Sequence, residues 1–261
     1  MKIRNGIACY IILVYALTCF SCNGSRHEEP VKGPAWLLSD FKFFWKYWNE
    51  EVKLSRDFLA YDENEKVIGK GIFLEKLLSG EYLPLRLKST GPLNYYKLYK
   101  INNQANDDIS STIKICAGIL FQNHKLVNKP LPGFSFIDLN GNLYNKETCK
   151  EKIVVLNFWF IHCTSCVAEM PVLNEMVNSY KNRDDIIFVS LALDSQTELK
   201  AFLEKKAFNY AIVPDMQHYL SDTLKIPAYP THVIINKKGL VVNVPEDYNE
   251  LAIELRKEAL K

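Results

Sequence analysis

Cys163 and Cys166 are the residues of this sequence whose type and spacing most clearly allow chemistry. They lie three positions apart in the segment FWFIHCTSCVAEMP, residues 158–171, where an apolar run ends and a helical pattern begins. Such a pair can be a structural disulfide, half of a metal site or a reactive dithiol. Each alternative makes a different demand on the surrounding residues.

A metal site and a purely structural bridge are both disfavoured. Structural zinc requires four ligands, and the sequence has no second cysteine pair with suitable spacing. The histidines that could complete a site are scattered: His124, His162, His218 and His232. Val167 follows Cys166 where covalent haem attachment would need a histidine, so neither a metal nor another cofactor is predicted. A bridge across so short a loop constrains the unfolded chain little.

The reactive dithiol has a mechanism that this position supports. At a strand-to-helix junction Cys163 stands at a helix N-terminus, where backbone N–H groups are unpaired and the helix dipole is positive. Both favour a thiolate, and in such motifs the cysteine pKa falls from about 8.5 to roughly 3.5–7.5. Cys166 lies one turn further on, so Cys163 would exchange with a disulfide and Cys166 would resolve the mixed disulfide.

The elements that position this dithiol follow from the hydrophobic pattern of residues 128–261. Residues 153–160 form a continuous apolar run, typical of a strand buried on both faces, and residues 186–193 form a second one. The remaining pattern predicts helices over residues 163–180, 197–206, 216–224 and 249–260, and hairpins over residues 134–144 and 231–244. This order predicts an α/β fold with a mixed central sheet and helices on both faces.

Residues 23–127 predict a small α+β domain that precedes this fold. Aromatic residues recur at helical spacing from Trp36 to Trp48, which is more typical of a core-facing helix than of a ligand platform. Short strand-like segments follow over residues 52–101, and then a helix opened by Asp107 and Asp108. Nothing in this region indicates a function.

The first 22 residues are similar to an export signal. A short positive start precedes an apolar stretch over residues 7–17, which is shorter than the roughly 20 residues of a membrane-spanning helix. Ser21-Cys22 then resembles a bacterial lipoprotein cleavage site, with Cys22 as the lipid-bearing residue. Lipidation at Cys19, ordinary cleavage and an uncleaved anchor are the alternatives. Export to the periplasm or cell envelope would let disulfides persist.

Cys116 and Cys149 are the other cysteines of the predicted folded part. They could form a disulfide between the two predicted domains. Cys116 also fits the apolar face of its predicted helix, and free cysteine is often simply buried. Both alternatives stay open.

The residues around the dithiol resemble the thioredoxin superfamily. The segments VVLNFWFIHCTSCVAEMP and IPAYPTHVIINKKGLVV are similar to those of the TlpA/ResA-like membrane-anchored thiol:disulfide oxidoreductases, over about residues 128–261. The resemblance implies a thioredoxin-like fold for this part. It also implies that Cys163 attacks, that Cys166 resolves, and that the two form a redox-active disulfide.

Two prolines extend the resemblance. Pro171, five positions after Cys166, would interrupt one hydrogen bond of the helix. Pro230 matches the cis-proline that faces the dithiol in the family, with Pro227 as a competing candidate. The resemblance therefore implies a cis bond between Tyr229 and Pro230. Backbone beside a cis-proline can pair with an extended substrate segment.

Asn157 and Glu169 alter the proton chemistry that the resemblance implies. Thioredoxins proper carry a buried aspartate where Asn157 stands, and an amide cannot titrate. Glu169, three residues after Cys166, matches a glutamate that lines the active-site cavity of the TlpA/ResA-like proteins. We predict that it carries a proton for Cys166 or contacts substrate. The alternative is a solvated carboxylate on a helix face.

His162, Thr164 and Ser165 depart from the family pattern, which usually has tryptophan before the first cysteine and a proline between the two cysteines. A protonated His162 would favour the Cys163 thiolate, and that charge would depend on pH. The alternative is an exposed loop histidine. We predict that these three residues modulate the redox potential.

Together these features predict a cell-envelope thiol:disulfide oxidoreductase that reduces disulfides of client proteins. Its electrons would come from a membrane thiol-shuttling protein, and one subtype would keep haem-binding cysteines reduced for cytochrome c maturation. Two other classes stay open: a redox-sensing or ligand-binding module without turnover, and a thiol peroxidase. Peroxidases of this fold place their cysteine after a proline and a threonine, a pattern missing before Cys163. The formal net charge is +2 and there is no basic run, so nucleic acid is not an expected partner.

Overall fold

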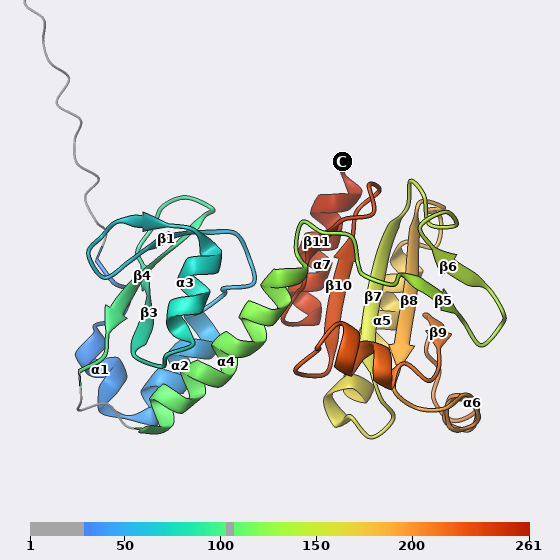
Figure 1. Ribbon diagram of the computed structural model, residues 1–261, viewed down its shortest axis with the longest axis horizontal. Helices are drawn as coiled ribbons and strands as arrows, with labels where there is room; N and C mark the ends of the chain where they lie inside the picture. The colour runs from blue at the N-terminus through green and yellow to red at the C-terminus, as the bar shows by residue number, and fades with distance from the viewer. Residues whose placement is uncertain (1–28, 103–106) are drawn as a thin grey trace, which may run out of the picture.

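The computed structural model describes residues 29–102 and 107–261 (Figure 1). The predicted export signal, with Cys19 and Cys22, lies outside these residues. Within the two described ranges, no helix combines the length and the apolar character needed to cross a membrane.

The N-terminal part is a four-stranded sheet with helices packed on it (Figure 1). Its strands follow the order β2-β1-β4-β3, with β1 parallel to β4 and the other neighbours antiparallel. Those strands are β1 (Phe58–Tyr61), β2 (Val67–Ile68), β3 (Tyr82–Leu87) and β4 (Asn94–Lys100). Its helices are α1 (Pro34–Ser39), α2 (Phe41–Glu51), α3 (Lys70–Leu77) and α4 (Asp107–Leu126).

The stripe of aromatic residues from Trp36 to Trp48 forms two helices, α1 and α2, and not one. Asp40 breaks it by accepting a hydrogen bond from the backbone nitrogen of Lys42, which caps α2. Phe44 and Trp48 enter the core, as a core-facing helix requires, whereas Trp36 and Trp45 are 41% and 43% exposed. Part of the stripe therefore lies at the surface.

The prediction of strand-like segments throughout residues 52–101 was wrong for α3. Phe73, Leu74 and Leu77 are fully buried on one face of this helix, while Ile72 is 53% exposed. The apolar run resembles a strand locally, but packing of α3 against α4 and the sheet selects the helix.

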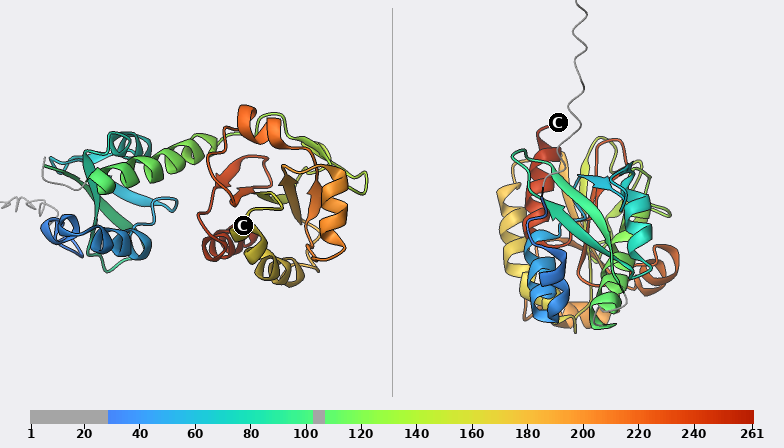
Figure 2. Two further views of the ribbon diagram at one scale, coloured as in Figure 1. Left: turned by 90° about the horizontal axis from the view of Figure 1, so that it is seen from below. Right: turned by 90° about the vertical axis from the view of Figure 1, so that its left-hand side faces the viewer.

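The C-terminal part is a five-stranded mixed sheet with helices on both faces (Figure 2). The strand order is β11-β10-β7-β8-β9; β7, β8 and β9 are parallel, and β10 runs antiparallel to β7 and to β11. Those strands are β7 (Ile153–Trp159), β8 (Ile186–Ala192), β9 (Ala211–Val213), β10 (Thr231–Ile235) and β11 (Val241–Asn243). The helical segments are α5 (Thr164–Ser179), α6 (Gln196–Leu203), η1 (Tyr219–Thr223), a π-helix, and α7 (Tyr248–Ala259). The predicted thioredoxin-like architecture is confirmed.

The central strand β7 separates two apolar cores, because side chains alternate between the faces of a strand. Ile153, Val155 and Trp159 point to the core formed with α5 and α7. Leu156 and Phe158 point to the core that contains residues of η1. Asn157 lies between Val155 and Trp159 in this alternation, so its side chain is on the α5 side of the strand. All seven residues of β7 are buried.

Both outer strands of this sheet are partly covered by other segments. The backbone nitrogen of Asn128 donates to the carbonyl of Val241 in β11 at 2.8 Å. On the opposite margin, Leu139 donates to the carbonyl of Ile212 in β9 at 2.8 Å. Leu139 follows β5 (Ser135–Ile137), which forms the predicted hairpin with β6 (Leu143–Asn145).

A polar cluster around the buried Glu250 joins the N-terminal and C-terminal parts. The hydroxyl of Ser55 donates to Glu250 Oε2 at 2.7 Å, and the Ser55 backbone nitrogen donates to Glu246 Oε1 at 3.2 Å. Arg56 Nε lies 3.9 Å from Glu250 Oε1. Burial raises the pKa of both glutamates, and hydrogen bonds from Ser55 oppose this. Helix α7 begins beside this cluster, so it is held to the N-terminal part where it starts.

Candidate active site

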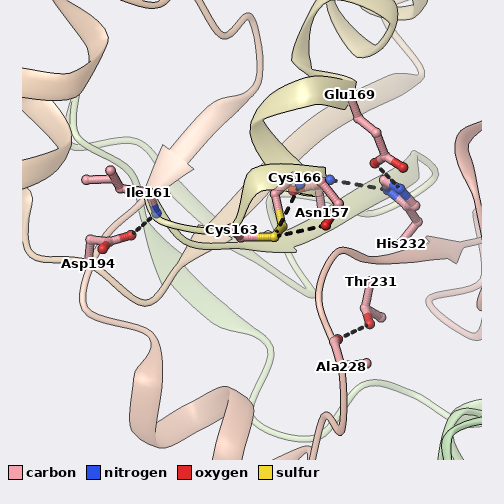
Figure 3. The surroundings of a disulfide bond; sticks show 10 residues. Asn157, Ile161, Cys163, Cys166, Glu169, Asp194, Ala228, Thr231 and His232 are labelled. Carbon is pink, nitrogen blue, oxygen red and sulfur yellow. Dashed lines mark hydrogen bonds and ion pairs between the residues drawn. A yellow bond between two sulfur atoms is a disulfide. The ribbon is translucent and has the colours of Figure 1, made fainter.

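Cys163 and Cys166 form a disulfide at the N-terminal end of α5 (Figure 3). Cys163 is the N-cap residue, with an extended backbone, and both side chains are buried. The backbone nitrogen of Cys166 donates to the Cys163 sulfur at 3.2 Å. The helix N-terminus thus directs an N–H group that has no partner within the helix, together with its positive dipole, at that sulfur. The same contact would stabilise a thiolate on Cys163 after reduction.

The residues around the two cysteines differ in how closely they approach the sulfur. The Ser165 hydroxyl lies 3.4 Å from the Cys163 sulfur. Thr164 and His162 are exposed. The pKa of Glu198, near the start of α6, is lowered mainly by hydrogen bonds with Ser195 and to a smaller extent by His162. Ser165 is therefore the one of these three for which the structure gives a direct contact with the sulfur.

The loop before the dithiol is fixed by a carboxylate from the next strand-loop junction. Asp194 Oδ2 accepts a hydrogen bond from the backbone nitrogen of Ile161 at 2.8 Å (Figure 3). The backbone nitrogen of Cys163 donates to the carbonyl of Phe160 at 3.1 Å. These bonds hold the turn that presents Cys163.

Pro230 lies in the loop that approaches the dithiol segment from the far end of the chain. The Tyr229–Pro230 bond is cis, in agreement with the expectation from the family pattern. The rings of Tyr229 and Phe160 meet edge to face, with centroids 5.6 Å apart. The Thr231 hydroxyl donates to the carbonyl of Ala228 at 2.7 Å, which fixes the loop on the other side of the proline (Figure 3).

Glu169 is half-buried and points to His232, on the face of α5 next to the sheet (Figure 3). Its Oε2 lies 3.2 Å from His232 Nε2. The other ring nitrogen, Nδ1, lies 3.3 Å from the amide nitrogen of Asn157. The structure therefore brings Glu169 and Asn157 together through a residue that the sequence did not single out as a site residue.

His232 was missed because its position depends on strand register. In the sequence it is one of several scattered histidines and lies between Thr231 and Val233, two residues after Pro230. In the sheet it pairs directly with Asn157 of β7, and both face α5. The available signal was its alternation with Ile234, which lies in the α5-facing core.

Three further residues named from the sequence have clear positions. Pro171 lies inside α5, which continues past it to Ser179. Cys116 and Cys149 are free thiols and form no bridge with each other. Burial raises the pKa of both thiols, which keeps them protonated and poorly reactive.

Known proteins match the part of the chain that carries this site. The AhpC/TSA family model matches residues 127–244. A thiol-disulfide oxidoreductase ResA of Bacillus cereus is 30% identical over 116 residues, which are 44% of this chain and 67% of that protein. This chain belongs to the ResA-like thiol-disulfide oxidoreductases. Family membership makes it a thiol-disulfide oxidoreductase with a thioredoxin-like fold.

Two further known proteins are similar to comparable shares of this chain. The thioredoxin-like protein YneN of Bacillus subtilis is 28% identical over 115 residues, 43% of this chain and 67% of its own length. The thioredoxin domain of a thiol-disulfide oxidoreductase from Bacteroides vulgatus covers 50% of this chain and 96% of its own, with 22% identity and a TM-score of 0.45.

Proposed function

We propose that this protein reduces disulfides of client proteins in the cell envelope, with Cys163 as the attacking and Cys166 as the resolving cysteine. The observation that carries the proposal is the pair at the N-terminus of α5, with a backbone N–H already directed at the Cys163 sulfur at 3.2 Å. Membership in the ResA-like family supports the reaction class.

The exchange balances as two successive displacements. The Cys163 thiolate attacks one sulfur of the client disulfide, forms a mixed disulfide and releases the other client sulfur as a thiolate that takes up a proton. Cys166 then loses its proton, attacks the Cys163 sulfur and releases the second client thiol. The client disulfide gains two electrons and the enzyme dithiol becomes the disulfide seen in the structure.

The remaining parts of the proposal follow from the sequence. Residues 1–22 would direct export, and a lipid on Cys22 would attach the protein to the membrane. Residues 23–127 would form a domain of their own before the thioredoxin-like domain at 128–261. A membrane thiol-shuttling protein would return the oxidised pair to the dithiol. Glu169, Pro230 and the residues between and before the cysteines would complete the site.

A trapping experiment tests the proposal. Cys166→Ser should accumulate clients as mixed disulfides through Cys163 when produced in native envelopes, because the resolving sulfur is gone. Cys163→Ser and the double variant are matched controls that should capture nothing. The wild-type protein should reduce insulin with dithiothreitol, and Cys163→Ser should not. If Cys166→Ser captures no client and wild type shows no turnover, the proposal is refuted; binding that changes with redox state but lacks turnover would identify a sensor instead.

A further inference from the structure

His232 is held between Asn157 and Glu169 at a position with almost no access to solvent. It is 1% exposed, and Asn157 is 2% exposed. Asn157 and His232 are direct cross-strand partners of β7 and β10, so their side chains leave the sheet side by side. Glu169 approaches from α5 above them (Figure 3). The three side chains form one line from the sheet to the helix that carries both cysteines.

For a neutral ring and the amide orientation of the structure, the neighbours of His232 assign its proton to one nitrogen. With the amide oriented as in the structure, the Asn157 nitrogen can only donate, so His232 Nδ1 accepts and carries no hydrogen. A neutral imidazole then has its single proton on Nε2 and donates it to Glu169 Oε2 at 3.2 Å. Asn157 thus selects the tautomer of His232, and in this tautomer His232 donates a hydrogen bond to the Glu169 carboxylate.

This arrangement leaves Glu169 with one oxygen held and one oxygen uncommitted to His232. We propose, on the basis of the function proposed above, that His232 is a positioning residue for the second step of the exchange. It fixes the Glu169 carboxylate in the orientation in which it accepts the proton of the Cys166 thiol. Asn157, which cannot itself titrate, contributes by keeping His232 in the donating tautomer.

Protons and electrons balance when Cys166 resolves the mixed disulfide. The Cys166 thiol gives its proton to Glu169, the resulting thiolate attacks the Cys163 sulfur of the mixed disulfide, and the leaving thiolate takes a proton from Glu169 or water. Among the described residues, Tyr210 is a buried titratable group whose charge interacts with Glu169; burial first, and then Glu169, raises the pKa of its phenol, which therefore stays neutral. It therefore does not compete for the proton.

The two steps can be observed separately with Ellman's reagent. The fully reduced protein should release one thionitrobenzoate as Cys163 forms the mixed disulfide and a second as Cys166 resolves it. Cys166→Ser should stop after the first. Because His232 acts through Glu169, variants of His232 should change the second phase and leave the first as it is.

Two substitutions of His232 differ by one methylene and separate positioning from packing. The amide of His232→Gln can reach the place of Nε2 and still donate to Glu169, whereas the amide of His232→Asn reaches only the place of Nδ1. We expect His232→Asn to slow the second phase about tenfold and Glu169→Gln about a hundredfold, within the range of general-base contributions. His232→Gln should recover most of the rate lost in His232→Asn. The exposed His218→Asn is the control and should change neither phase.

Combining the substitutions gives the decisive result. If His232 acts only through Glu169, the variant with both Glu169→Gln and His232→Asn should be no slower in the second phase than Glu169→Gln alone. Additive losses, or equal slowing of both phases by His232→Asn and His232→Gln, would overturn the inference. Thermal unfolding identifies any variant that fails to fold. If one fails, the ¹⁵N chemical shifts of His232 in the wild-type protein provide the test: they must show the Nε2–H tautomer, and the opposite tautomer overturns the inference. A wild-type protein that releases no second thionitrobenzoate refutes the proposed function itself, which is a different outcome.

Discussion

Ser55→Ala should weaken the junction between the two parts of the molecule, by an amount that depends on pH. The substitution removes the 2.7 Å hydrogen bond from the Ser55 hydroxyl to Glu250, whose residue is only 1% exposed. Glu250 Oε2 keeps a bond from the backbone nitrogen of Glu246 at 3.1 Å. Hydrogen bonds to charged groups contribute about 1.5–3 kcal/mol, and neutral ones about 0.5–1.5 kcal/mol. The ionised carboxylate should therefore lose the larger amount and the protonated form the smaller.

The sign of the pH dependence follows from the direction of the pKa shift. Burial raises the pKa of Glu250 above its ordinary value of 4.5, and the bond from Ser55 opposes that rise. Because the folded pKa is raised, the stability tied to this group is fully present below the unfolded pKa. It is lost as the pH rises through the folded pKa. Without Ser55 the folded pKa rises further, so wild type and variant differ most on the alkaline side.

Urea unfolding at about pH 5 and at about pH 8 measures the loss of unfolding free energy on the acidic and on the alkaline side of the Glu250 titration. Far-UV circular dichroism follows the whole chain. Tryptophan fluorescence follows mainly α1 and α2, because three of the four tryptophans lie there and the fourth, Trp159, lies in β7. Ser39→Ala, an exposed serine bonded only within α1, is the matched control and should stay within about 0.5 kcal/mol. A loss that is the same at both pH values would refute the assignment of the effect to the Glu250 carboxylate.

Two further predictions concern the presentation of Cys163. Ser165→Ala removes the hydroxyl that lies 3.4 Å from the Cys163 sulfur. Alkylation of the reduced protein by iodoacetamide near neutral pH should therefore slow roughly two- to fivefold, whereas Thr164→Ala should leave the rate unchanged. An unaltered rate for Ser165→Ala would contradict a role for this hydroxyl. Asp194→Ala removes the acceptor for Ile161 N and should cost about 1.5–3 kcal/mol in urea unfolding and slow the first thionitrobenzoate phase. Asp194→Asn keeps a carbonyl acceptor and should lose less, and equal losses in the two variants would argue against the hydrogen bond.

The C-terminal part could be predicted from the sequence because its signals are local. A continuous apolar run over β7 is typical of a strand buried on both faces, and two short turns with glycine mark the hairpins. The dithiol follows directly from cysteine spacing at the end of that run. The Pro230 loop could be placed only through the family resemblance, since nothing in the local pattern brings Phe160 and Tyr229 into contact.

Features that depend on tertiary packing could not be predicted in the same way. The α3 segment has apolar residues on more than one side, and only contact with α4 decides which are buried. His232 acquires its neighbours from the pairing of two strands more than seventy residues apart, whose register the sequence does not state. The polar cluster between the two parts likewise joins Ser55 to Glu250, which lie 195 residues apart in the sequence.

The covered margins of the five-stranded sheet have a consequence for a protein proposed to reduce disulfides of client proteins. Unpaired backbone groups on an outer strand are a template that any extended polypeptide can join. Here the backbone of Asn128 and Lys129 already pairs with Val241 of β11, and Leu139 pairs with Ile212 of β9. A client with a loose strand would find part of each margin already paired, and under the proposed function its contact would then fall to the loop at Pro230.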